Sequence, residues 1–171
     1  MKRPTMTPIL LTLLLPLTLW AQITTVRQTR PTVIPSSYHY AVKVVCGSDK
    51  GYILSKGSYK TAINIYNPND TTVVFSKHLV PAPPGETGPT YEINPYTSIG
   101  AGLALEIDCA ELFEVAYDYL KQKETTLLKG FVILESKFPL NVVAVYTSEP
   151  LSRWCGGTSS IDVETVYPTR R

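Results

Sequence analysis

The chain has 171 residues, of which 44% are hydrophobic and 18% are charged. This length suits one domain, and the normal apolar content excludes both an intrinsically disordered chain and a coiled coil. Apart from one N-terminal candidate, no run reaches the roughly 18 consecutive apolar residues that a membrane-spanning helix needs.

The N-terminus has the three parts of a secretory signal peptide. Lys2 and Arg3 give a positive start, an apolar run follows, and Ala21 offers a small residue for cleavage. A helix of about 12 residues spans only roughly 18 Å, which is too short for a hydrocarbon core of about 30 Å. We therefore expect a cleaved signal peptide over 1–21 and a secreted or periplasmic protein. The alternative is an uncleaved N-terminal anchor.

Cleavage changes the charge balance of the chain. Loss of Lys2 and Arg3 from the 16 basic residues leaves 14 basic residues against 14 acidic ones, so the mature protein is near neutral. Apart from the terminal Arg170-Arg171 pair, no basic patch is left to contact a phosphate backbone. We expect no nucleic-acid partner, and no stable membrane span after cleavage.

Three cysteines, Cys46, Cys109 and Cys155, lie in the part of the chain expected to reach an oxidising compartment. An odd number predicts one disulfide and one leftover thiol. Cys46 ends one predicted strand and Cys109 follows another, so we favour a Cys46–Cys109 bridge, with Cys46–Cys155 and no bridge as alternatives. The favoured bridge would close a loop of about 63 residues and stabilise the fold by roughly 4 kcal/mol. Cys155, in a Gly-rich loop, is then a free thiol or a link between two copies.

After a polar, extended leader at 22–37, short β-branched and aromatic runs alternate with turn residues. The predicted strands are 38–46, 61–67, 72–80, 91–94, 103–108, 127–136, 140–147 and 159–166. We expect a hairpin across the turn at 67–70, and a central hairpin from the two most apolar runs, 127–136 and 140–147. In the last strand, the alternation predicts that Ile161 and Val163 point inward.

A short helix is expected from Cys109, because Asp108 followed three residues later by Glu111 resembles a capping box. The segment 114–124 either extends this helix or forms an exposed loop. About seven or eight strands with one short helix predict an all-β fold. We expect an antiparallel β-sandwich or jelly roll over 38–168, with a tail at 169–171.

Motifs for catalysis and metal binding are scarce. The two histidines, His39 and His78, are interpreted as ordinary sheet residues, and no G-x-S-x-G elbow exposes a serine. The sequence holds no C-x-x-C, H-x-H or H-E-x-x-H spacing, no P-loop and no dinucleotide fingerprint. Glu106 and Asp108 share a strand face as paired carboxylates of a glycosidase would, but a solvated face and a helix cap explain them better. We expect no enzyme activity, no catalytic residue, no cofactor and no metal.

Tyrosine is enriched relative to phenylalanine, with 11 Tyr against 4 Phe, and this indicates a binding role. A ring with a polar tip suits interfaces and contacts with sugars or peptides. Six tyrosines fall in predicted loops or at strand ends and are the candidate contact aromatics: Tyr52, Tyr59, Tyr91, Tyr96, Tyr117 and Tyr119. The alternative is that these rings line the rims of the sandwich.

Five segments stand in a recognisable order: AINIYNPND, FSKHLV, INPYTSIGAGLALEIDC, GFVILESKFPLNVVAVYTS and SIDVETVYP. This order resembles a group of exported bacterial proteins without assigned activity and, more loosely, is similar to the sensory rhodopsin transducer-like β-sandwich family. The resemblance covers about 60–167. It implies a non-enzymatic sandwich that assembles into small oligomers and acts by binding a partner. No functional residue is carried over.

These patterns together predict an exported, non-catalytic β-sandwich that acts as a binding or assembly module. Its expected partner is another protein or a second copy of itself. One alternative is a secreted carbohydrate-binding or glycoside-hydrolysing domain, whose ligand would be a glycan. Another is a structural subunit of a surface assembly, in which the leader at 22–37 exchanges as a strand.

Overall fold

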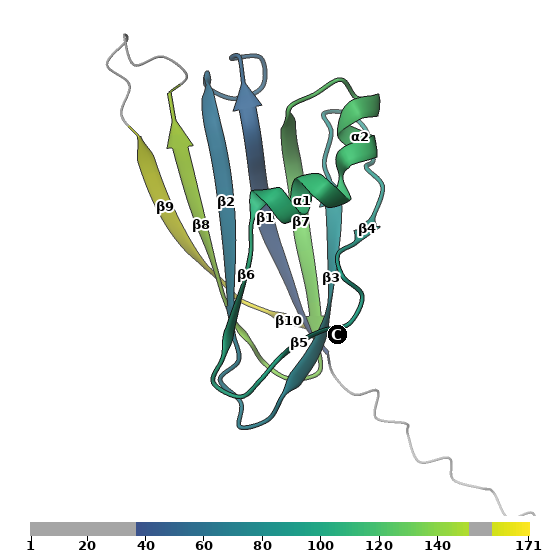
Figure 1. The fold of residues 1–171 in the computed structure, drawn as a ribbon, viewed down its shortest axis with the longest axis vertical. Helices are drawn as coiled ribbons and strands as arrows, with labels where there is room; N and C mark the ends of the chain where they lie inside the picture. Colours follow the sequence, from purple (N-terminus) through teal and green to yellow (C-terminus); the bar gives the residue numbers. More distant parts are fainter. Residues whose placement is uncertain (1–36, 151–158) are drawn as a thin grey trace, which may run out of the picture. The chain divides into compact units, whose positions relative to one another are not determined.

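A computed structural model describes residues 37–150 and 159–171 (Figure 1). The strands are β1 (Tyr38–Asp49), β2 (Gly57–Tyr66), β3 (Val73–Pro81), β4 (Tyr91–Glu92), β5 (Thr97–Ile99), β6 (Ala104–Ile107), β7 (Leu127–Ser136), β8 (Asn141–Glu149), β9 (Ser160–Val166) and β10 (Thr169–Arg170). The two helices of this part are α1 (Cys109–Val115) and α2 (Tyr117–Gln122). The predicted all-β, antiparallel fold is confirmed. The predicted signal peptide at 1–21, the leader up to residue 36, and Cys155 lie outside the described residues.

One continuous sheet carries the described strands, and it forks between β1 and β2. Its order is β4-β3-β7-β1-β2-β8-β9, with β5 beside β3, β6 beside β2 and β10 beside β1. β1 and β2 pair only over Gly47–Asp49 and Gly57–Tyr59. Beyond this point β2 pairs with β6, while the opposite end of β1 pairs with β10. The strands β3, β7 and β1 therefore form one branch, and β2, β8 and β9 form the other.

Both branches place alternate side chains in one hydrophobic core. On β1 the fully buried side chains are Tyr40, Val42, Val44 and Cys46, as expected for one face of a pleated strand. The other large, fully buried side chains come from both branches and from the segment between β3 and β7: Ile63, Ile65, Val73, Leu79, Ile93, Ile107, Leu112, Leu128 and Leu134. On β1 and on β2, alternation along the strand therefore places one face in the core.

Helix α1 crosses in front of β1 and β7 (Figure 1). Its N-cap is Asp108, whose carboxylate accepts the backbone N–H of Glu111 at 3.0 Å, as half of the predicted capping box. The Glu111 carboxylate does not return to the cap but accepts a hydrogen bond from Lys77 Nζ on β3 at 2.9 Å. Lys77 is buried and Glu111 is partly exposed, so this ion pair joins α1 to β3 at the edge of the core. The start of α2 at Tyr117 makes most of the segment 114–124 helical.

Both hairpin predictions are wrong. In the described sheet β2 pairs with β8 and β3 pairs with β7, so each of the two turns carries the chain from one branch to the other. At the first turn, the side-chain amide of buried Asn67 donates to the carbonyl oxygens of Ile99 and Gly100 at 3.0 Å, which ties the turn to the β5–β6 connection. At the second, the Tyr40 hydroxyl donates to the Leu140 carbonyl at 2.9 Å and accepts its N–H at 2.7 Å.

The C-terminal strands require two more corrections. Ile161 and Val163 do not point into the core, since they are 71% and 60% exposed. The reason is that β9 is the last strand of its branch and pairs only with β8 within the described residues. Thr169–Arg170, expected as a tail, instead form β10 beside Tyr38 and His39 of β1.

Candidate functional site

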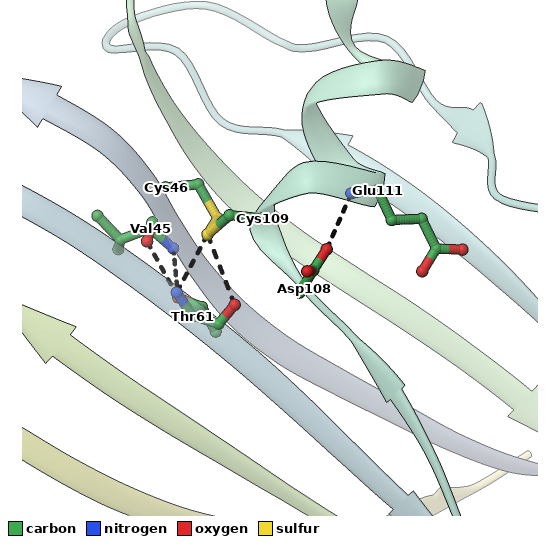
Figure 2. Close-up of a disulfide and its surroundings, with 6 residues drawn as sticks. All are labelled: Val45, Cys46, Thr61, Asp108, Cys109 and Glu111. Carbon is green, nitrogen blue, oxygen red and sulfur yellow. Dashed lines mark hydrogen bonds between the residues drawn. A yellow bond between two sulfur atoms is a disulfide. The ribbon is translucent and has the colours of Figure 1, made fainter.

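The predicted Cys46–Cys109 disulfide is present, and it lies where the sheet forks (Figure 2). Cys46 is fully buried on β1, and Cys109 is the first residue of α1. The two Cα atoms are 5.6 Å apart, although 63 residues separate them in the chain. The bridge therefore fixes α1 to the central strand of the sheet.

Thr61 spans the gap at which β2 leaves β1. Its Oγ1 accepts the N–H of Val45 at 3.0 Å and donates to the carbonyl of Val45 at 3.1 Å. One hydroxyl thus satisfies two backbone groups that a paired strand would otherwise satisfy. The Thr61 N–H in turn points to the Cys109 sulfur at 3.2 Å (Figure 2). Sequence reasoning missed Thr61 because threonine is common in strands, and only the β1–β2 register reveals its position.

A cleft of about 490 Å³ lies beside this junction. Its apolar walls come from three elements: Ala62 on β2, Val145 opposite it on β8, and Phe113 on α1. Lys60 and Asp108, both exposed, add one positive and one negative charge to the lining. An apolar cleft of this size with a few polar groups is the usual form of a ligand-binding site.

The structure separates the two carboxylates of the glycosidase interpretation. Asp108 lines the cleft and caps α1, whereas Glu106 stands on β6 and is not among the lining residues. The cleft therefore presents one carboxylate to a bound group. Glycoside hydrolysis in its common forms needs two.

The six candidate contact tyrosines do not gather at one place. Tyr52, Tyr96 and Tyr117 are 88%, 92% and 64% exposed. The rings of Tyr91 and Tyr119 contact each other edge to face, with centroids 6.4 Å apart, and burial raises the pKa of Tyr119. The sixth, Tyr59, lines the cleft, and its hydroxyl donates a hydrogen bond to a carbonyl oxygen of the neighbouring loop. The cleft thus contains one of the six.

Asp49 organises the loop that holds Tyr52 outward. Its carboxylate is 4% exposed and accepts the backbone N–H groups of Gly51, Tyr52, Ile53 and Leu54 at 2.7 to 3.0 Å. Burial by itself would raise the pKa of Asp49, but the four N–H donors outweigh it and lower the pKa below its ordinary value. The loop is therefore built around a buried negative charge.

A second polar cluster lies at the start of β1. Ser37 Oγ is 2.6 Å from Nε2 of His39, and Nδ1 of His39 is 3.3 Å from Oε1 of Glu135. Hydroxyl, imidazole and carboxylate follow one another in the order of a catalytic triad. The sequence did not reveal this cluster, because Glu135 reaches His39 only through the β1–β7 pairing. The backbone N–H of Ser37 is already donated to the Arg171 carbonyl, so it does not serve as an oxyanion donor.

Two kinds of feature are absent from residues 37–150 and 159–171. No group of three or more His, Cys, Asp and Glu side chains in these ranges is placed to hold a metal ion. None of the helices there combines the length and the apolar character that crossing a membrane requires.

Comparisons with known proteins add one distant likeness. No family of known proteins matches the chain, and no curated protein matches its sequence. Among solved structures, the crystal structure of Thermotoga maritima 1070 aligns with a TM-score of 0.45 and 11% identity, over 77% of this chain and 91% of that chain. A likeness at this level carries no argument, and the resemblance to the transducer-like family stays a prediction.

Proposed function

We propose that this protein is an exported, non-catalytic binding and assembly module that takes an apolar group of a protein partner in the cleft beside the disulfide. The construction of that cleft is the observation that carries the proposal. Its walls stand on β2, β8 and α1, and the start of α1 is fixed by the Cys46–Cys109 bridge. Walls anchored in this way hold their shape before a ligand arrives, which reduces the entropy lost on binding.

Export is supported by two independent features. The N-terminal 21 residues have the charge and apolar pattern of a signal peptide. Cys46 and Cys109 form a bridge inside the fold, and structural disulfides persist in oxidising compartments. We therefore propose a secreted or periplasmic protein.

The chemistry of the walls favours a protein partner over a glycan. Ala62, Phe113 and Val145 offer no hydrogen-bonding side chains. A sugar hydroxyl set against these three side chains would stay unpaired, which costs free energy, and only the part of a sugar beside Ser58, Tyr59 or Thr147 would find a partner. An aliphatic or aromatic side chain would lose only apolar contact with water. Lys60 and Asp108 would then orient the polar backbone of the same partner.

Filling the cleft tests this proposal. Random peptides displayed on phage are selected on the purified protein, and the enriched peptides are then measured on Ala62→Phe and Ala104→Phe. Ala62 lines the cleft, whereas exposed Ala104 on β6 does not and serves as the matched control. We expect peptides with an apolar anchor whose affinity falls about tenfold or more, or 1.4 kcal/mol, in Ala62→Phe alone. If Ala62→Phe binds every enriched peptide as the wild type does, the cleft is not the binding site.

The Ser37–His39–Glu135 cluster favours a second candidate function, acyl transfer by an activated serine. A fluorophosphonate probe reports it, because the serine oxygen forms a bond to phosphorus and fluoride leaves while His39 accepts the hydroxyl proton. Wild type, Ser37→Ala, His39→Ala and the exposed-serine control Ser98→Ala are compared after exposure to the probe. We expect no labelling that depends on Ser37, because its backbone N–H is donated to Arg171 and offers no oxyanion donor. Labelling lost in both Ser37→Ala and His39→Ala, but kept in Ser98→Ala, would replace the non-catalytic proposal.

A further inference from the structure

β9 presents an unpaired strand edge. It is the last strand in the order of the sheet, and among the described residues only β8 pairs with it. The residues Ser160–Thr165 are exposed, with Ile161 and Val163 forming an apolar stripe. A free edge of this kind offers backbone N–H and C=O groups to another strand.

The β9 edge is also acidic. Asp162 and Glu164 alternate with the two apolar residues, and the neighbouring strand β8 carries Glu149 but no lysine or arginine. If β9 paired with β9 of a second copy about Val163, Asp162 would stand opposite Glu164, and like charges in opposite positions destabilise a sheet. The edge therefore suits a basic strand better than a copy of itself.

The segment 22–36 has the complementary charge. It carries Arg27 and Arg30 and no acidic residue. Residues 22–30 contain no proline, so every residue in this stretch can donate its N–H to a ladder. Nine extended residues reach up to about 30 Å, which exceeds the length of a seven-residue strand such as β9.

Ser37 is the first described residue, and it lies beside the end of β10. Ser37 and Arg171 exchange two backbone hydrogen bonds, with N–O distances of 3.0 and 3.1 Å, so the β1–β10 ladder extends to Arg171. Strand addition within one chain would leave the protein a monomer, whereas addition to a second copy would produce an oligomer. The molar mass therefore distinguishes the two arrangements.

We propose that residues 22–30 of one copy add as an antiparallel strand to the β9 edge of a second copy. In the register that sets Arg27 opposite Asp162, Val26 stands opposite Val163 and Ile23 stands opposite Val166. Opposite charges then meet on one face, and apolar residues meet on both faces. This inference rests on the assembly part of the proposed function and makes the partner a second copy of the chain.

A charge swap tests the register. The full exported protein carries Cys155→Ser, so that no intermolecular disulfide contributes, and its molar mass is measured by size exclusion with light scattering across a dilution series. We expect an oligomer whose dissociation constant rises about fivefold in Arg27→Glu and in Asp162→Arg, and returns toward the starting value when both changes are combined. Lys56→Glu makes the same charge change at an exposed position outside the interface and should keep the oligomer.

Two results would overturn the inference: a monomer at all concentrations, or an oligomer that neither single charge reversal weakens. Arg27→Glu alters none of the core residues of the described domain, so it remains informative even if Asp162→Arg disturbs β9. Peptide binding in the cleft is measured separately with Ala62→Phe. A failure of strand addition and a failure of the cleft proposal are therefore distinguishable.

Discussion

β1 and β9 have similar alternating sequences and opposite environments. On β1 the side chains of Tyr40, Val42 and Val44 are fully buried, whereas Val163 on β9 is 60% exposed. β1 pairs with β7 from Tyr38 to Gly47 and has α1 attached to it by a disulfide, while among the described strands β9 pairs with β8 alone. The alternation predicts a strand in both cases. Burial is decided by the strands and helices on either side, and these come from distant parts of the chain.

Removing the disulfide at β1 should produce the largest loss of stability. We expect the double variant Cys46→Ala and Cys109→Ala to lower the free energy of unfolding by about 4 kcal/mol, because the bridge closes a 63-residue loop in the unfolded chain. Urea denaturation of the purified protein measures this change. Cys155→Ser is the control and should leave the midpoint unchanged. A loss smaller than about 1 kcal/mol would mean that the bridge constrains the unfolded chain very little.

A matched pair of valine truncations compares the two strands directly. Val42→Ala should cost about 2 kcal/mol, since it opens a cavity in a closely packed core. Val163→Ala should change the stability of the dissociated protein by less than about 0.5 kcal/mol, because the side chain of the single chain is mostly in water. Both values come from the same urea titration, made at a dilution at which the protein is monomeric. Equal losses in the monomer would contradict the exposure of β9.

The hydroxyl of Tyr40 on β1 is bonded to Leu140 in the turn between β7 and β8. Tyr40→Phe keeps the ring but leaves the N–H and C=O of Leu140 without their buried partner. We expect a loss of about 1.5 kcal/mol in the free energy of unfolding. The control is Tyr167→Phe at an exposed tyrosine, where no change is expected. If Tyr40→Phe is neutral, the hydroxyl does not stabilise the crossing.

The smallest effect is a pH dependence of the loop that joins β1 to β2. The folded state lowers the pKa of Asp49 below its ordinary 3.8, so the carboxylate contributes its full stabilisation above that pH and loses it as the pH falls through the folded value. We compare thermal unfolding of wild type and Asp49→Asn between pH 7 and pH 2. The wild type should be the more stable of the two at neutral pH, and the difference should shrink below pH 4. A difference independent of pH would contradict the role of the charge.

Local patterns predicted the strands well and their partners poorly. The run 127–136 coincides with β7, and the Asp108 cap at the start of α1 was visible in the spacing to Glu111. The turn after Asn67 was also visible, but its amide bonds to residues far along the chain, and so the turn does not close a hairpin. A turn residue indicates that the chain changes direction, but it does not determine which strand the next strand pairs with.

The candidate site was only partly predictable for a similar reason. The odd number of cysteines pointed to one bridge, and the positions of Cys46 and Cys109 at the ends of predicted strands favoured this pair. Thr61, Phe113 and Val145 carry no individual signal, and they meet only because β2, α1 and β8 converge at the fork. A short strand such as β10 offers too few residues for any periodicity.

The position of β1 also sets an order of events during folding. Tyr38 pairs with Ser136 and with Arg170, so the first strand of the domain has no complete set of neighbours until the C-terminus has been synthesised. Strand pairs between distant residues form slowly, because the long intervening chain must be closed first. β1 therefore gains its full set of neighbours only when residues near the C-terminus pair with it.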